Sequence, residues 1–224
     1  MMTNIAGKGL LLLSGGFDSP VAGHLMKQQG LDIDAIHFSL EPVTDDAAEK
    51  KCMELARIVG FRKVYVAKVG EVFTKIASSC SHRFYFVLSK RLMVRVAEAV
   101  ARRDGYSFLV TGENLGQVSS QTLQNLTVID NAAKIPVLRP LLGFDKQEII
   151  SVAKKLGTYE TSKGPEICDA LGPDKPSTAA TLPEILQEET NLNGEGLVEK
   201  VVGDLEERAI PPPAKAAGKK EAAG

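Results

Sequence analysis

The stretch that most limits the fold of this chain is a leucine run at residues 10–13 that leads directly into Ser-Gly-Gly-Phe-Asp-Ser at residues 14–19. The run has the length of a short buried strand, and residues 19–29 have the pattern of a helix. A strand that breaks at two glycines and continues as a helix directs several backbone N–H groups at one small volume, where the helix dipole adds positive potential. Gly15 and Gly16 let a ligand approach the backbone, because neither carries a Cβ atom. The stretch therefore predicts a phosphate-binding turn in an α/β domain.

The polar side chains of this turn indicate which class of phosphate-binding loop it resembles. Ser14 and Ser19 supply hydroxyl groups, and Asp18 supplies a carboxylate that could meet Mg²⁺ or a reacting group. The turn lacks the dinucleotide fingerprint and the Gly-Lys-Ser/Thr end of a Walker loop. It resembles the Ser-Gly-Gly-x-Asp-Ser loop of the PP-loop ATP pyrophosphatases, which hold the pyrophosphate of ATP while a substrate attacks the α-phosphate. The alternative is an ordinary strand-to-helix turn.

Strands and helices alternate along the first two thirds of the chain. Strands are expected at 10–13, 31–38, 63–69, 106–111 and 137–139, and helices at 19–29, 45–59, 84–103, 117–126 and 145–156. This alternation predicts an α/β fold with a doubly wound, mainly parallel sheet and helices on both faces. Ligands bind such sheets outside the carboxyl ends of the strands. The turns at residues 14–16, 37–38 and 112–113 are therefore expected to converge on one pocket.

The character of the chain changes beyond Gly164. Prolines predict mostly loop there, with one more amphipathic helix at 197–208. Residues 211–224 contain no apolar side chain larger than alanine except prolines, and we interpret them as a disordered tail. The expected organisation is an ATP-binding domain at 1–178, a loop and helix extension at 179–210, and the tail at 211–224.

Composition excludes several classes of protein. A chain of 224 residues suits one domain with an appended element. No apolar run approaches the roughly 20 residues of a membrane span, and no secretory signal precedes the first strand, so a cytoplasmic location without membrane contact is expected. Cys52, Cys80 and Cys168 are odd in number and form no C-x-x-C pair, which argues against a disulfide framework or a zinc or iron–sulfur site. A net charge of −1 argues against strong nucleic-acid binding by this chain alone.

Four later stretches resemble one family within the PP-loop superfamily. They are Lys-Arg-x-Met at 90–93, Thr-Gly-Glu-Asn-Leu-Gly-Gln at 111–117 with its continuation to 126, Arg-Pro-Leu…Asp-Lys-x-x-Ile at 139–149, and Pro-Glu-x-Cys at 165–168. In this order and spacing they are similar to the tRNA 4-thiouridine synthetases, the ThiI-type tRNA uracil 4-sulfurtransferases. The resemblance runs from about residue 10 to residue 183.

The resemblance implies a two-step reaction. The family adenylates O4 of a tRNA uridine with ATP, and a persulfide or sulfide sulfur then displaces AMP. The implied nucleotide-binding residues are Leu12, Leu13, Ser14, Gly15, Gly16, Ser19, His37, Phe38, Lys90, Gly112 and Gln121. Asp18 and Lys146 match the functional aspartate and lysine, with Asp18 as the Mg²⁺ ligand, and Cys168 matches the sulfur-handling cysteine. A carboxylate with a metal ion and an ammonium suits the charge that adenylation builds, and a thiol suits sulfur transfer.

For several of these residues the sequence also allows a role without function in binding or catalysis. His37 could be a satisfied histidine at a strand end, and Lys90 and Lys146 could be solvated helix charges. Cys52 lies on an apolar helical face and is expected in the core, whereas Cys80 has no pattern that assigns it a role.

Three arginines, Arg91, Arg95 and Arg102, are spaced to share one helix face. Such a stripe is usually a solvated face. The alternative is contact with RNA.

The chain departs from the family pattern in ways that affect its partners. The first strand begins too early for the N-terminal tRNA-binding module, no rhodanese-like module is expected, and Cys168 is followed by Asp-Ala-Leu rather than a second nearby cysteine. We therefore expect tRNA to be bound through a separate RNA-binding protein and sulfur to come from an external persulfide or sulfide donor. The assembly state, a homodimer among the alternatives, stays open. So do two other functions, namely adenylation of a different acceptor in thiamine-type sulfur transfer and nucleotide binding without turnover.

Overall fold

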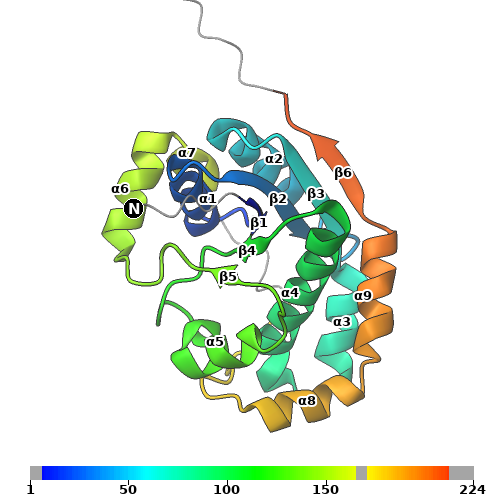
Figure 1. The fold of residues 1–224 in the computed structure, drawn as a ribbon. Coiled ribbons are helices and arrows are strands. Elements are labelled where there is room, and N and C mark those ends of the chain that lie inside the picture. The colour runs from blue at the N-terminus through cyan, green and yellow to red at the C-terminus, as the bar shows by residue number, and fades with distance from the viewer. Residues whose placement is uncertain (1–6, 165–170, 212–224) are drawn as a thin grey trace, which may run out of the picture.

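The computed structural model describes residues 7–164 and 171–211, and these residues contain one six-stranded sheet with the strand order β5-β4-β1-β2-β3-β6 (Figure 1). The strands are β1 Lys8–Leu12, β2 Asp32–Ser39, β3 Lys63–Lys68, β4 Phe108–Val110, β5 Val137–Leu138 and β6 Glu206–Ala209. Strands β1 to β5 pair in parallel, and β6 pairs antiparallel with β3. The predicted doubly wound, mainly parallel sheet is confirmed.

Helices cover both faces of this sheet (Figure 1). They are α1 Asp18–Gln28, α2 Ala47–Val59, α3 Gly70–Ser79, α4 Tyr85–Asp104, α5 Leu123–Asp130, α6 Lys146–Leu156, α7 Tyr159–Ser162, α8 Leu182–Thr190 and α9 Gly194–Gly203, with 3₁₀ turns η1 His82–Phe84 and η2 Ser119–Gln121. Apolar side chains of α1, α2 and α6 form one core against the sheet, and those of α3, α4, α5, α8 and α9 form the other. Each face of the sheet is therefore buried, which is why β1 to β4 consist mainly of apolar residues.

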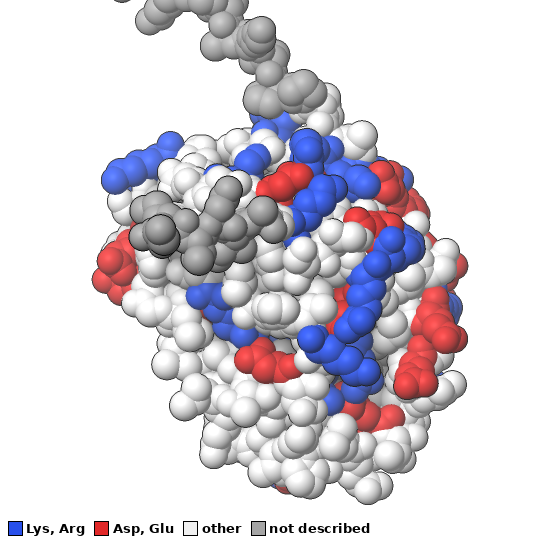
Figure 2. Space-filling model, viewed as in Figure 1, with Lys and Arg blue, Asp and Glu red and all other residues white. Residues whose placement is uncertain are grey.

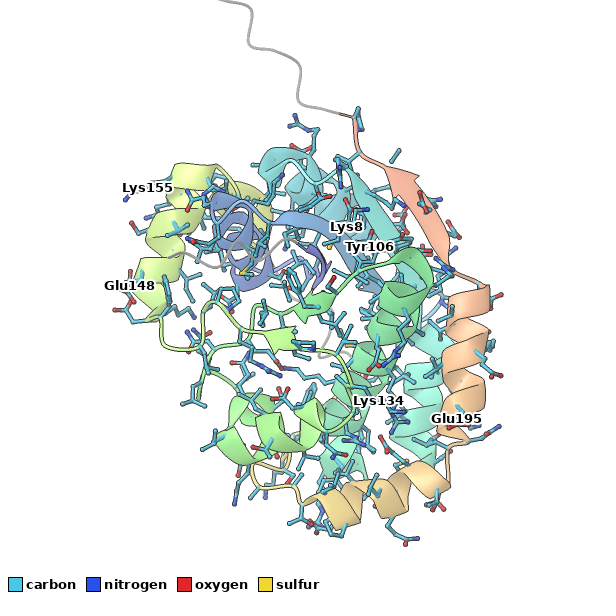
Figure 3. The ribbon with its side chains drawn as sticks, in the orientation of Figure 1. Lys8, Tyr106, Lys134, Glu148, Lys155 and Glu195 are labelled. Carbon is cyan, nitrogen blue, oxygen red and sulfur yellow. The ribbon has the colours of Figure 1, made fainter. Side chains whose placement is uncertain are left out.

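Local signals account for several helix ends. Helices α2, α4 and α6 end at Gly60, Gly105 and Gly157, each in the left-handed conformation that glycine adopts without steric cost. Helix α6 begins with a capping box in which Asp145 and Glu148 each accept a hydrogen bond from the other's backbone N–H; Figure 3 shows Glu148 at this end of α6.

The prediction is wrong in places where the chain lacks strong periodicity. The helix expected at 117–126 begins only at Leu123, where Thr122 caps it, and the preceding residues form η2 and loop. The region after Gly164, expected to be mostly loop, contains α8, which starts after a Thr181–Glu184 capping box with proline in its first turn. The last helix ends at Gly203, and the residues beyond it form β6 on the edge of the sheet.

The boundary expected at residue 178 and the tail expected at 211–224 stay predictions. β6 lies beyond that boundary yet pairs with β3, and residues 212–224 lie outside the described part of the chain. None of the helices in the described ranges is long and apolar enough to cross a membrane.

The arginine stripe on α4 is solvated only at Arg102, which is exposed, whereas Arg91 is buried and Arg95 is half-buried. Arg91 is 1% exposed, and its Nε and Nη2 donate to the two carboxylate oxygens of Glu189 at 2.8 and 3.0 Å. Arg95 pairs with the same carboxylate, and Arg102 pairs with Glu98 on its own helix. Two of the three arginines therefore attach α8 to α4.

Charge on the visible face is mixed. Figure 2 shows a band of lysine and arginine side chains on the side where α4 lies in Figure 1, with acidic side chains between and beside them. With a net charge of −1, this distribution does not provide a large surface of one sign on this face.

Candidate active site

Two loops meet where the strand order of the sheet changes direction. Strand β1 lies between β2 and β4, so the chain moves to one side after β1 and returns to the other side at β4. The loop after β1, residues 14–19, is here called the PP-loop, and residues 111–113 follow β4. A methyl group on Gly112 would lie only 2.6 Å from the backbone N and 2.7 Å from the Cα of Ser19. The two predicted loops are therefore in direct contact at the point where doubly wound sheets bind ligands.

The PP-loop is held by its own serines. The Ser14 N–H donates to Ser19 Oγ at 2.8 Å, and Ser19 Oγ donates back to the Ser14 carbonyl at 3.2 Å. The Gly16 N–H donates to Ser14 Oγ at 3.3 Å. Asp18, half-buried, is the first residue of α1. Both hydroxyls therefore hold the backbone of the loop in its shape.

Helix α7, which the sequence patterns did not predict, supports the PP-loop from outside. Ser162 Oγ donates to the Gly16 carbonyl at 3.2 Å, and both residues are buried. The rings of Phe17 and Tyr159 lie with their centroids 5.4 Å apart. A segment almost 150 residues away in the chain therefore fixes the loop conformation.

His37 lies beneath the loop and is buried. Its Nδ1 is 3.2 Å from the Leu13 carbonyl and 3.2 Å from Cys52 Sγ. Because a carbonyl oxygen only accepts hydrogen bonds, Nδ1 carries the proton, and burial lowers the pKa of the imidazole, which keeps it neutral. Nε2 is then a buried acceptor without a partner among the described residues. The neighbouring Phe38 points to the opposite face of the sheet, because side chains alternate along β2.

Lys90 is not a solvated helix charge. Its Nζ is 2.8 Å from Glu113 Oε1, and Arg139 Nε is 2.9 Å from Glu113 Oε2. Burial alone would raise the pKa of Glu113, but the charges of Lys90 and Arg139 outweigh burial and lower it. A buried carboxylate therefore holds two cations at the carboxyl ends of β4 and β5.

The remaining predicted residues divide into three groups. Leu12 and Leu13 pack in opposite cores at the end of β1, and Gln121 is buried in η2 with Oε1 unpartnered in the described residues. Lys146 is exposed at the start of α6, and within the described residues it forms no hydrogen bond or ion pair with the PP-loop. Cys168 lies outside the described residues.

The two described cysteines have no features of a sulfur carrier or a metal ligand set. Cys52 is buried in the core, as predicted. Burial raises the pKa of the half-buried Cys80 thiol to about 11, and its Sγ is 3.7 Å from the Glu188 carbonyl, so the thiolate is disfavoured. Within the described ranges, no group of three or more histidine, cysteine or acidic side chains is arranged to bind a metal ion.

Comparison with known proteins identifies the family. The ThiI family, described as thiamine biosynthesis protein (ThiI), matches residues 4–193. The chain belongs to the ThiI family. The probable tRNA sulfurtransferase of Alkaliphilus metalliredigens is 42% identical over 210 residues, which are 91% of this chain and 54% of the relative. That of Coxiella burnetii is 40% identical over 212 residues, 90% of this chain and 53% of the relative. The chain thus spans about half the length of these curated relatives.

Solved structures agree with this assignment. A 4-thiouridine synthetase in complex with RNA and bound ATP matches with a TM-score of 0.86 and 33% identity, over 92% of this chain and 55% of that one. The NMN synthetase from Francisella tularensis matches with a TM-score of 0.56 and 17% identity, over 90% of this chain and 79% of that one, which is a likeness of fold alone.

Four residues of this ThiI-family site were not singled out from the sequence. Glu113 and Arg139 lie inside the matched motifs, but no pattern indicated that they form an ion pair. Ser162 carries no sequence signal for its bond to Gly16. Lys51 packs against Gly15; its position three residues after Ala48 and four before Leu55 places it beside the apolar face of α2, a signal that could have indicated a partly buried lysine.

Proposed function

We propose that this chain is the catalytic domain of an ATP-dependent tRNA sulfurtransferase that converts a tRNA uridine to 4-thiouridine. The observation that carries the proposal is the direct contact between the PP-loop and Gly112 at the change in strand order. It occurs in a ThiI-family chain that is similar along 92% of its length to a 4-thiouridine synthetase with bound ATP. Both loops belong to the motifs that carried the family resemblance.

The residues of the loop fit the phosphates of ATP. Glycines and backbone N–H groups meet at the N-terminus of α1, and a side chain at Gly15 would take up space on the loop surface. A single carboxylate, Asp18, also fits Mg²⁺, because this ion is commonly held by one or two carboxylates together with substrate phosphates. Bound there, Mg²⁺ would neutralise negative charge on the phosphate oxygens.

In the first step, O4 of uridine attacks the α-phosphorus of ATP, the bond to the bridging oxygen of the β-phosphate breaks, and pyrophosphate leaves. Backbone N–H groups of the PP-loop stabilise the departing pyrophosphate, and we assign Lys146 to the phosphoryl oxygens. We assign the other predicted residues, His37, Phe38, Lys90 and Gln121, to the nucleotide.

In the second step, sulfur attacks C4 of the adenylated base and AMP leaves. With sulfide, HS⁻ supplies both electrons of the new C–S bond. With a persulfide donor, the terminal sulfur passes to Cys168 and the donor thiolate leaves. The Cys168 persulfide then attacks C4 and AMP leaves. An added thiol attacks Cys168 Sγ, which releases thiouridine and leaves a mixed disulfide on Cys168, and a second equivalent of thiol reduces this disulfide. This role of Cys168 is supported by the Pro-Glu-x-Cys resemblance alone.

The partners follow from charge and chemistry. A mixed surface charge and a net charge of −1 favour tRNA binding through a separate RNA-binding protein. The sulfur comes from an external persulfide or sulfide donor, and the reaction takes place in the cytoplasm, where such tRNA substrates occur. A homodimer is one assembly in which the chain could act.

A second candidate is adenylation of a non-tRNA acceptor in thiamine-type sulfur transfer. The description of the family as a thiamine biosynthesis protein favours it. The chemistry at ATP is the same, and only the attacking acceptor differs.

The test is to incubate the purified protein with ATP, Mg²⁺, sulfide and bulk tRNA, with and without cell extract, and to measure pyrophosphate and thiouridine. Thiouridine formation would support the first candidate. Pyrophosphate release that depends on extract but not on tRNA would favour the second, and ATP binding without any turnover would contradict both. Asp18→Ala and Lys146→Met should lower turnover more than ATP affinity if these residues act on the transition state. Equal losses would contradict that role.

A further inference from the structure

Lys51 on α2 lies against the PP-loop. A methyl group placed on Gly15 would be 3.0 Å from Lys51 Cδ, 3.5 Å from Cε and 3.6 Å from Nζ. The outer half of the lysine side chain therefore occupies the position next to Gly15 where other residues have a side chain. Lys51 is half-buried, so its ammonium group is held near the loop and does not extend freely into solvent.

The ammonium group of Lys51 forms no hydrogen bond or ion pair with any residue in 7–164 or 171–211. It is next to the N-terminus of α1, where the helix dipole and the loop N–H groups already create positive potential. The Asp18 carboxylate supplies one negative charge at this helix start, and the ammonium of Lys51 adds positive charge on the side of Gly15. The arrangement thus favours an anionic ligand at this place.

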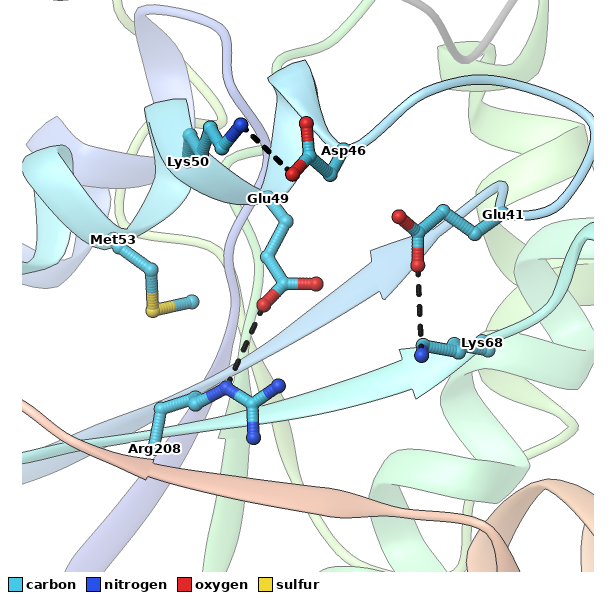
Figure 4. A pocket seen from close by; sticks show the side chains of 7 residues that line it. All are labelled: Glu41, Asp46, Glu49, Lys50, Met53, Lys68 and Arg208. Atoms are coloured by element: carbon cyan, nitrogen blue, oxygen red, sulfur yellow. Dashed lines mark ion pairs between the residues drawn. The ribbon is translucent and has the colours of Figure 1, made fainter.

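The adjacent lysine shows a different environment on the same helix. Lys50 is exposed, and its Nζ is 2.8 Å from Asp46. It faces a separate hollow of about 270 Å³ that is shown in Figure 4 and is lined by Glu41, Asp46, Glu49, Lys50, Met53, Lys68 and Arg208. The charged groups of that hollow pair with one another, as between Arg208 and Glu49 at 3.6 Å. A further anion is therefore not needed there.

We propose that Lys51 binds the pyrophosphate part of ATP on the PP-loop and neutralises it as it leaves. This inference rests on the proposed function. Gly15 then serves a second purpose, because the missing Cβ gives the lysine side chain room to reach the phosphates. Lys51 supplies its charge from α2, whereas Lys90 lies on α4 and is paired with Glu113 after β4.

The experiment compares Lys51→Met with Lys50→Met as the matched control, by calorimetric titration with ATP, pyrophosphate and AMP. Loss of one charge-assisted contact should weaken ATP and pyrophosphate binding about tenfold or more in Lys51→Met. AMP affinity should change less than about twofold, because AMP lacks the β- and γ-phosphates. Lys50→Met should bind all three ligands like the wild type, and Lys51→Arg should retain most of the ATP affinity. Lys51→Gln provides the same comparison should the methionine variant fail to fold.

The outcomes separate this inference from the function on which it rests. A wild-type protein that binds ATP, together with a folded Lys51→Met variant of equal ATP affinity, would overturn the role of Lys51 and leave the proposed function intact. Equal weakening of ATP and AMP would also overturn it, because it would indicate a general distortion of the site. Absence of ATP binding by the wild type would overturn both proposals.

Discussion

At the scale of single residues, buried polar groups decide how this site responds to pH. Glu113 is a carboxylate between two cations, Lys90 and Arg139. His37 is a neutral imidazole under the PP-loop, with Nδ1 against the Leu13 carbonyl. Burial disfavours the charged imidazolium of His37, whereas at Glu113 the two adjacent cations outweigh burial and favour the carboxylate. Glu113 is therefore favoured in its charged form, and His37 in its neutral form.

Glu113→Gln should lower the free energy of unfolding by about 3 kcal/mol or more at pH 7, because it leaves two cations around a buried neutral amide. The folded-state pKa of Glu113 is lowered, so its contribution is fully present above the unfolded value of about 4.3 and is lost as the pH falls through the folded pKa. Urea unfolding at pH 7 and below pH 4 measures this difference. The exposed Glu199→Gln is the control. A difference that stays constant with pH would contradict the ion-pair explanation.

Stability should also fall as the pH drops below about 6.5, the pKa of histidine in an unfolded chain, in part because of His37. Burial lowers the pKa of His37 in the folded protein, so the unfolded chain binds the proton more readily. Acidification therefore stabilises the unfolded state relative to the folded state. His37→Gln should make the dependence of unfolding free energy on pH flatter in this pH range. Part of the slope should remain, since the pKa of His24 is lowered by burial as well. His82→Gln removes an exposed imidazole and is the control; a slope that changes as much in this variant would contradict the assignment.

At the scale of elements, short segments from distant parts of the chain hold the site. Helix α7 is only four residues long, yet its Ser162 binds the PP-loop. Helix α8 is joined to α4 through Glu189 and Arg91, and β6 extends the sheet at β3. Of these connections, the Ser162 bond holds the PP-loop itself, and the other two attach α8 and β6 to the rest of the fold.

Ser162→Ala should cost about 1 kcal/mol of unfolding free energy, because the buried Gly16 carbonyl loses its donor. Amide hydrogen exchange at residues 14–18 should become faster, since the loop loses its outer support. Ser151→Ala, at an exposed position of α6, should stay within about 0.5 kcal/mol of the wild type. Unchanged exchange in the loop of Ser162→Ala would indicate that α7 does not hold it.

At the scale of the whole molecule, a ligand at the change in strand order would connect the two halves of the sheet. The PP-loop belongs to β1 and α1, and Gly112 follows β4 on the other side of β1. A nucleotide that contacts both loops binds only the folded chain, so it stabilises the entire domain.

ATP at 100 times its dissociation constant should raise the Tm of the wild type by about 5–10 °C. Gly15→Val should abolish this shift while the protein remains folded, because the new side chain takes space on the loop and the three atoms nearest to its Cβ all belong to the flexible Lys51 side chain. Gly203→Val, where no atom lies within 4 Å of the added Cβ, should show the full shift. Thermal unfolding followed by circular dichroism measures all three proteins. An undiminished shift in Gly15→Val would contradict phosphate binding on this loop.

The strand, the glycine turn and the helix start at residues 10–29 could be predicted because their signals are local. Leucines that form a buried strand, two glycines and a polar helix start are adjacent in the chain, and so are the capping residues that set the ends of α2, α4 and α6. The same locality explains why the order of strands and helices predicted a doubly wound sheet.

Only the tertiary structure decided which distant side chains meet. Arg91 has the spacing of a solvated stripe, but the position of α8 buries it against Glu189. Ser162 and Gly16 are far apart in the chain, as are Lys51 and Gly15, and no periodic pattern relates them. Helix and strand periodicity reports which face of an element is apolar, whereas a contact between two elements depends on how both are packed. The sequence alone therefore determined the strand, turn and helix start at residues 10–29, and packing decided which charges and hydroxyls surround the turn.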